Sequence, residues 1–256
     1  MKKRTLITFF LALAAHLAFA WGSVGHRAIA EIAYQNLDKK AKKAITQLLG
    51  SDYLPLYANW ADEIKSDNAE FKALGKTPHY INMTEDETFE MAKDHKYSIY
   101  NAYQEQLSIL QDKGKSDQER AIALKLLVHF IADMHQPMHC GRPEDRGGND
   151  VKVTWFGTSS NLHRVWDSDL INYTQLSYSE LATFALYYSQ AADKDLYSTD
   201  PALWLNESKR LADDIYAHVG NGKFYYAYPY QYLETVYTQI EKAGLRMAEV
   251  FNAALK

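Results

Sequence analysis

The sequence predicts a mainly α-helical protein, folded as a single compact domain with at most one short β-hairpin. Three observations favour this fold class. Apolar residues recur at helical spacing through most of the chain, and only one short stretch around Val153 alternates as a strand does. No segment repeats the strand and helix alternation of a parallel-sheet enzyme. With 256 residues, 47% of them hydrophobic and 23% charged, the chain has the composition of a folded globular protein.

The first twenty residues have the pattern of a secretory signal peptide. Three basic residues at positions 2–4 precede the mostly apolar segment 6–17, and Ala18-Phe19-Ala20 supplies the small residues read at a cleavage site. We therefore expect residues 1–20 to be removed, leaving a single catalytic domain over 21–256 that begins at Trp21. No later segment reaches about 18 apolar residues, so we expect a periplasmic or secreted protein that does not insert into the membrane.

The first half of the mature chain reads as helices separated by turns. Residues 26–37 carry apolar side chains at helical spacing, and residues 40–49 continue as a helix between the turn signal Asp38 and the closing Gly50. Residues 59–65 read as a short helix, and Pro78 introduces an extended segment at 79–82. A long helix is predicted over 97–110.

The second half contains the longest predicted helix, over 116–134. Leu124, Leu127, Val128 and Ile131 form its apolar stripe, and Pro137 ends it. Residues 140–149 form a glycine-containing loop, which leads into the one predicted strand pair. The remaining segments have helical patterns, namely 163–176, 179–190, 201–219 and 231–255.

The net charge and the cysteine content limit which classes of function fit the chain. The net charge is −4 and becomes more negative when the basic leader is removed, which argues against a broad basic nucleic-acid groove. A polyanionic substrate would then need a local source of positive charge, for which a bound metal is the obvious candidate. Cys140 is the only cysteine, so no intramolecular disulfide can hold this exported chain together.

Histidine and aspartate residues occur at the spacing of metal ligands. His129 and Asp133 share one face of a helix, as do His163 and Asp167. Either pair alone is more often a surface hydrogen bond or a satisfied core histidine than a metal site. The combination of four segments that carry His or Asp on apolar helices, with imidazole and carboxylate ligands but no thiolate, favours a hydrolytic zinc cluster that also joins the helices. The additional candidate ligands are Trp21, through its free amine, His26, Asp62, His79 and His139.

These motifs together resemble the zinc-dependent single-strand-specific nucleases of fungi and the bifunctional nucleases of plants. The strings that carry the resemblance run in order along the chain: Trp21-Gly-x-x-Gly25-His26, Trp60-Ala61-Asp62, His79-Tyr80-Ile81-Asn82, the segment from His129 to His139, Gly147-Gly148-Asn149, and the segment from Asn161 to Asp167. The resemblance implies the helical fold that this family shares with zinc phospholipase C. It also implies a monomer that binds three Zn²⁺ ions.

The resemblance assigns each ligand to one zinc. Trp21, through its amine and carbonyl, and His26 would hold one ion, and Asp133 would bridge it to a second. The second ion would be held by Asp62, His79 and His129, and the third by His139, His163 and Asp167. The implied reaction is hydrolysis of single-stranded DNA and RNA to 5′-phosphorylated products, with a 3′-nucleotidase activity as well. Asp62 would help to deprotonate the attacking water.

Four residues are candidates for contacts with substrate nucleotides. Tyr80 is expected either to stack on a base or to pack in the core, and Asn82 stands where the family commonly has a carboxylate. Lys65 replaces an arginine that contacts phosphate, and Asn149 follows two glycines that allow a close backbone approach. His135, by contrast, is expected to point away from the ligand face into solvent.

Two other functions remain open from the sequence. A zinc phospholipase C-like phosphodiesterase would share the fold and the three metals, but that family ends its ligand set in glutamate, whereas Asp167 stands here. A non-catalytic zinc-binding protein is the second alternative.

Overall fold

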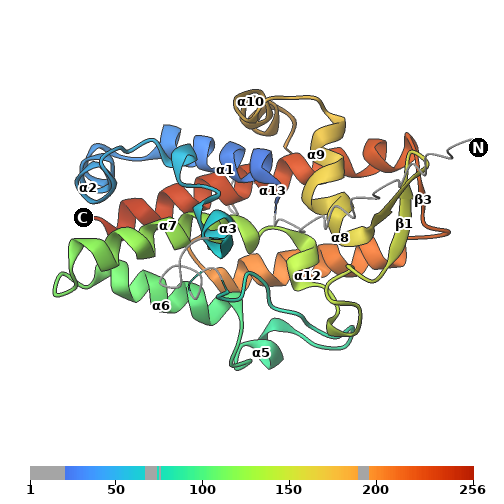
Figure 1. Cartoon of the computed structure of the whole chain (residues 1–256), viewed down its shortest axis with the longest axis horizontal. Coiled ribbons are helices and arrows are strands. Elements are labelled where there is room, and N and C mark those ends of the chain that lie inside the picture. Colours follow the sequence, from blue (N-terminus) through green and yellow to red (C-terminus); the bar gives the residue numbers. More distant parts are fainter. Residues whose placement is uncertain (1–20, 67–73, 75, 190–195) are drawn as a thin grey trace, which may run out of the picture.

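The computed structural model describes residues 21–66, 74, 76–189 and 196–256. The predicted signal peptide, residues 1–20, lies outside the described residues, as does the last residue of the helix predicted over 179–190. The fold is an elongated helical bundle, with the C-terminus and α2 at one end and the small sheet at the other (Figure 1). The predicted mainly α fold class is confirmed.

The described residues form helices, short 3₁₀ and π-helical turns, and three strands. In order they are α1 (Ser23–Asn36), α2 (Lys39–Leu49), η1 (Leu54–Leu56), α3 (Trp60–Glu63), η2 (Ile64–Ser66), α5 (Phe89–Ala92), α6 (Ile99–Gln111), α7 (Asp117–Asp133), η3 (Pro137–Cys140), η4 (Pro143–Asp145), β1 (Lys152–Trp155), β2 (Thr158–Asn161), α8 (Leu162–Arg164), the π-helical turn η5 (Val165–Asp169), α9 (Leu170–Tyr173), α10 (Tyr178–Tyr188), α12 (Pro201–Ala217), β3 (Lys223–Phe224) and α13 (Ala227–Ala254).

Local signals explain where the helices begin and end. The Asp38 side chain accepts a hydrogen bond from the Ala41 N–H and caps α2, which ends at Gly50 in the left-handed conformation with φ 82°. Ser116 and Glu119 form a reciprocal capping box at the start of α7. These contacts satisfy N–H groups that would otherwise have no partner within the helix.

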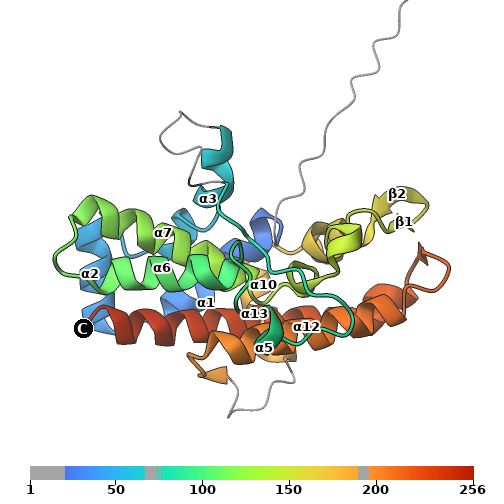
Figure 2. The ribbon, with the colours of Figure 1, turned by 90° about the horizontal axis from the view of Figure 1, so that it is seen from below.

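The long C-terminal helix α13 forms the spine of the bundle. It packs against α1 and α10, while α6 packs against α7 (Figure 2). At Gly244 the helices α13 and α1 approach so closely that an added Cβ would lie 2.5 Å from the Cβ of Ile32. Glycine at this position therefore sets how closely α1, which carries His26, lies to the rest of the core.

The small sheet has the order β2-β1-β3. β1 and β2 are antiparallel and form the predicted hairpin, with Lys152 opposite Asn161. Phe156 and Gly157 both have positive φ, as a two-residue hairpin turn requires. The two-residue strand β3 adds a parallel partner to β1 that the sequence did not predict.

Two predicted helices have different bounds in the structure. The segment 163–176 divides into α8, the π-helical turn and α9, and α13 begins at Ala227, before the predicted start at 231. Within the part of the chain that the structure describes, none of the helices has the length and apolar character needed to cross a lipid bilayer.

Candidate metal centre

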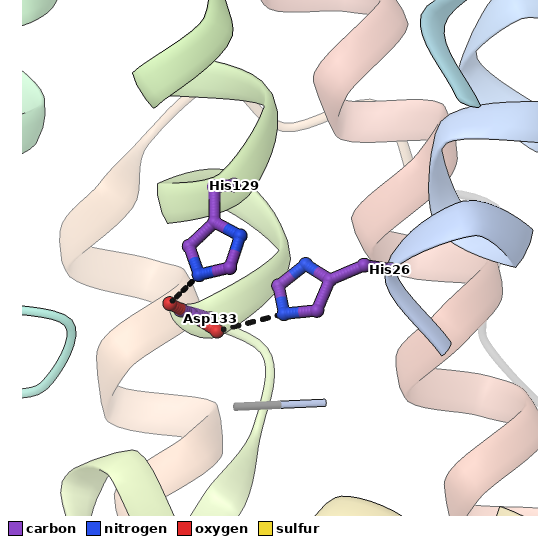
Figure 3. A group of neighbouring side chains, drawn as sticks. All are labelled: His26, His129 and Asp133. Atoms are coloured by element: carbon purple, nitrogen blue, oxygen red, sulfur yellow. Dashed lines mark ion pairs between the residues drawn. The ribbon is translucent and has the colours of Figure 1, made fainter. Parts of the chain in front are cut away.

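The C-terminal end of α7 carries the centre of the ligand cluster. His129 and Asp133 lie one helical turn apart, and their Nε2 and Oδ2 atoms are 3.1 Å apart. His26 approaches from α1, with its Nε2 atom 3.3 Å from Oδ1 of Asp133 (Figure 3). The His26 and His129 rings stack with centroids 4.0 Å apart. The carboxylate of Asp133 thus lies between two imidazoles, as a bridging ligand would.

A second group includes Asp62 from α3 and His79 from the extended segment. The Nε2 atom of His129 lies 3.7 Å from Oδ2 of Asp62, and Nδ1 of His79 lies 4.0 Å from Oδ1 of Asp62. His79 is also 3.1 Å from Oδ2 of Asp133. Asp62, His79 and His129 together have the spacing needed to hold a metal ion.

The third group lies on the other side of Asp133. His163 Nε2 is 3.1 Å from Oδ2 of Asp167, and His139 Nε2 is 3.8 Å from Oδ1 of the same residue. His139 connects this group to the others, because its Nδ1 atom lies 3.5 Å from Oδ1 of Asp133. The three groups of candidate ligands therefore form one continuous cluster among the described residues.

Backbone carbonyls orient two of the imidazoles. Nδ1 of His129 lies 3.0 Å from the carbonyl oxygen of Ala58, and Nδ1 of His163 lies 2.7 Å from that of Gly147. A carbonyl only accepts, so each Nδ1 carries a proton, and Nε2 is the nitrogen that faces the cluster and can bind a metal once it is unprotonated. Metal-ligating histidines commonly have this arrangement. Gly147 has φ 65°, a conformation that glycine adopts without strain and that places its carbonyl here.

Unpartnered buried atoms test whether a metal fits this cluster. Buried polar atoms almost always have a hydrogen-bond partner. Seven of those that have none belong to predicted ligands: His26 Nδ1, His26 Nε2, His79 Nε2, His129 Nε2, Asp133 Oδ1, His139 Nδ1 and Asp167 Oδ2. Lone pairs from imidazole and carboxylate groups directed at shared points suit zinc, so the residues present fit the metal.

The pKa values of the cluster reflect the competition between burial and charge. Burial alone would lower the pKa of His129, but the carboxylates of Asp133 and Asp62 outweigh it and raise the value to about 9. Burial lowers the pKa of His139 to about 4. The pKa of Asp133 is held well below its usual value because His129 and His139 outweigh the effect of its burial. Asp133 is therefore a carboxylate at any working pH.

The predicted first residue of the mature chain lies beside the third group. Trp21 is fully buried, and its indole N–H donates to the carbonyl of Ala132 at 3.0 Å. The N–H of Gly22 donates to the carbonyl of Asp167. Gly22, Asp62 and Asp167 also line a hollow of about 410 Å³. These contacts place the backbone of residues 21 and 22 next to the ligand cluster.

The four predicted substrate contacts line a second hollow beside the cluster, of about 590 Å³. Ligands from two of the groups share its wall. Tyr80 is 49% exposed there, so it lies on the wall and not in the core. Lys65 pairs with Asp62, Nζ to Oδ1, at 2.5 Å. The predicted substrate contacts and ligands that line this hollow are Lys65, Tyr80, Asn82, Asn149, His79, His139 and His163.

The structure adds two cationic residues to this hollow that sequence reasoning missed. Lys76 and Arg146 both line it. Arg146 has φ 56° and a side chain held by Asp150 through two hydrogen bonds, of 2.9 and 2.7 Å. No local pattern signalled either residue, because each reaches the hollow only through the path of its loop. Together with Lys65 they supply positive charge where a phosphate would approach.

The expectation that His135 lies in solvent was wrong, although the residue does face away from the ligands. This residue is fully buried, since α12 and α13 cover the side of α7 that faces away from the ligands.

Comparison with known proteins identifies the family. The family model described as S1/P1 Nuclease matches residues 21–256. The chain belongs to the S1/P1 nuclease family. The match begins at Trp21 and includes all the predicted ligands, so the resemblance found in the sequence is confirmed, and the helical bundle is that of a nuclease of this family.

Relatives at about 30% identity agree with this assignment. The chain is 30% identical to Endonuclease 2 of Arabidopsis thaliana over 96% of this chain and 94% of the relative. It is 31% identical to Nuclease S1 of Aspergillus oryzae, over 76% of this chain and 70% of the relative. It is 28% identical to Nuclease P1 of Penicillium citrinum, over 91% of this chain and 97% of the relative.

Proposed function

We propose that this member of the S1/P1 nuclease family is an exported endonuclease that uses three Zn²⁺ ions. Its substrates are single-stranded DNA and RNA, which it hydrolyses to 5′-phosphorylated products, and it also acts as a 3′-nucleotidase. The observation that carries the proposal is the opening of the buried ligand cluster into the hollow lined by Tyr80 and Asn149.

Zinc bound in the three groups would supply Lewis acidity and a positive charge that attracts phosphate. Asp62 is our candidate for the proton acceptor, because it is only 6% exposed, belongs to one of the ligand groups and lines the hollow that it shares with Gly22 and Asp167. Burial would raise the pKa of Asp62, but His129 and Lys65 outweigh it and keep the value below normal. The carboxylate is therefore ionised and able to accept a proton from the attacking water.

The walls of the hollow account for recognition of nucleotides. Tyr80 exposes its ring for stacking against a base, and Asn82 offers both a donor and an acceptor to the base edge. Lys65, when not paired with Asp62, reaches a phosphate as a point charge without bidentate geometry. Because His79, His139 and His163 line this hollow, a nucleotide that has left its stack can reach them. This favours single strands over duplex.

The same proposal covers cellular location. Residues 1–20 act as a signal peptide, and the released chain begins at Trp21, so that its amine becomes a ligand beside His26. The product is a periplasmic or secreted monomer. The start of the family match at residue 21 supports this cleavage position.

A substrate panel tests the proposal. The zinc-loaded chain beginning at Trp21 is given single-stranded DNA, the duplex of the same sequence, single-stranded RNA, a 3′-nucleotide and phosphatidylcholine vesicles. We expect rapid hydrolysis of both single strands to 5′-phosphorylated products, phosphate release from the 3′-nucleotide and slow cleavage of the duplex. Preferential hydrolysis of the lipid would instead support the phospholipase alternative.

A further inference from the structure

The link 134–136, which follows the candidate ligand Asp133 and leads towards the candidate ligand His139, is buried. Asp133 ends α7 and His139 lies in η3, and the residues between them include Met134, His135 and Gln136, all fully buried. Asp133 and His139 belong to different ligand groups, so the residues that connect them contribute to the distance at which the two are held. A displacement of the link would change the positions of both ligands.

Two side chains anchor the link from outside it, and one side chain of the link reaches a candidate ligand. The hydroxyl of Ser208 on α12 donates to the carbonyl of Met134 at 2.7 Å, and the amide of Gln239 on α13 donates to the carbonyl of His135 at 2.9 Å. The amide of Gln136 donates to Oδ1 of the candidate ligand Asp167. Helices far along the chain therefore hold the link directly.

The imidazole of His135 is fixed between two partners. Its Nδ1 atom lies 2.7 Å from the carbonyl oxygen of Ile131, which can only accept, and its Nε2 atom lies 2.9 Å from a guanidinium nitrogen of Arg246, which can only donate. These partners require a neutral ring with the proton on Nδ1. The ring of Trp204 lies against the imidazole, with centroids 5.2 Å apart.

Arg246 is itself part of a buried charge cluster. It is fully buried, and the same guanidinium nitrogen lies 2.8 Å from Oε2 of Glu207 on α12. Lys242 contacts the other oxygen of Glu207 at 3.1 Å. Burying these charges brings little net stability, so a specific geometric role is the better reason for their presence.

We propose that Arg246 and Glu207 are positioning residues for the metal centre. Acting through His135, they hold the link 134–136 against α12 and α13 and so set the separation between Asp133 and His139. This inference rests on the proposed zinc-dependent function. Metal-site geometry must be held to within about 0.5 Å, and loss of outer partners costs about 10- to 100-fold in metal affinity or activity.

The test compares Arg246→Met with a control that removes buried side-chain atoms elsewhere in α13. Val250→Ala serves as the control because Val250 is buried on the same helix but has no polar contact with the link. Gln239→Leu is made alongside, since it removes one hydrogen bond to the link and leaves the buried charges balanced. Arg246→Lys is the conservative variant. Unfolding temperatures identify conditions in which all four variants are folded.

Three readouts are measured: retention of zinc against a chelator, the absorption spectrum of the cobalt-substituted protein, and kcat and KM on a dinucleotide. We expect Arg246→Met to retain zinc about 10- to 100-fold more weakly, to shift the cobalt spectrum and to lower kcat more than it raises KM. Gln239→Leu and Arg246→Lys should show the same changes to a smaller extent. Val250→Ala should lower only the unfolding temperature.

Wild-type zinc retention and an unchanged cobalt spectrum in folded Arg246→Met and Gln239→Leu would overturn the inference. So would equal changes in the Val250→Ala control. Because zinc retention and the cobalt spectrum need no catalysis, they decide this question even if the wild-type chain cleaves none of the proposed substrates. That last result would refute the proposed function alone.

Discussion

The backbone N–H of Gly22 donates a hydrogen bond to the backbone carbonyl of Asp167, joining the beginning of the folded chain to the third ligand group. Residues 145 positions apart in sequence are thus held together where a metal would be bound. The contact holds the backbone at the predicted start of the mature chain beside a candidate metal ligand. It also leads to the first prediction.

Retaining Ala20 before Trp21 should weaken the site. The free amine, a nitrogen ligand once it is deprotonated, becomes an amide that does not bind zinc in the same way. We expect at least about tenfold lower activity and fewer zinc ions per chain, since even outer partners of ligands have effects of this size. The measurement is metal content and activity of the two preparations side by side. Identical values would show that the amine is not a ligand.

Asp62→Asn should separate folding from chemistry. The amide keeps the size of the side chain but cannot accept a proton from water, so we expect a loss of about 10²- to 10⁴-fold in kcat with the fold retained. Glu90→Gln, which alters an exposed carboxylate on α5, should have no effect. A folded Asp62→Asn variant that keeps its zinc and full activity would remove Asp62 from the catalytic role.

Tyr80→Ala should weaken substrate binding. Stacking of a base on an aromatic ring contributes about 1–3 kcal/mol, so KM for single-stranded DNA should rise by roughly 5- to 150-fold. The control is Tyr187→Ala, since Tyr187 is even more exposed but lies on α10. If both variants have the wild-type KM, then the hollow beside His79 is not where the base binds.

Zinc binding should release protons at mildly alkaline pH. His129 in the metal-free protein has a pKa raised from 6.5 to about 9, so it carries a proton that zinc must displace. Calorimetry in two buffers with different heats of ionisation, at a pH of about 7 to 8, should therefore detect at least one proton released per chain. Release of none would contradict the assignment of His129.

The same pKa shifts give the metal-free protein a defined pH dependence. The folded pKa of His129 lies above the unfolded value, so its stabilising contribution is complete below pH 6.5 and is lost as the pH rises towards about 9. The folded pKa of His139 is about 4, so stability also falls as the pH decreases from 6.5 towards 4. Denaturant unfolding across this range checks both directions.

The ligand groups could be predicted from sequence because local motifs carry them. His129 and Asp133 share a helix face whatever surrounds the helix, and Trp60-Ala61-Asp62 and His79-Tyr80 are short strings that a family resemblance can match. The structure brings these segments together as expected, although their metal roles remain predictions. The fold class followed from the same helical periodicity.

The surroundings of the site could not be predicted, for physical reasons. The helix pattern showed that His135 faces away from Asp133, but not that α12 and α13 cover that face. Its partner Arg246 is one residue in a long helix, 111 positions away. Arg146 reaches the hollow only because its loop adopts left-handed backbone angles. Such placements depend on tertiary packing, which a single sequence does not display.

The most direct test of the central claim is hydrolysis of single-stranded DNA by the chain beginning at Trp21, measured before metal removal, after it, and during re-addition of counted zinc. The account predicts that activity disappears on stripping and returns fully only as three zinc ions bind per chain, with 5′-phosphates on the products. Activity that survives complete metal removal, or a chain loaded with three zinc ions that leaves single-stranded DNA intact, would contradict it.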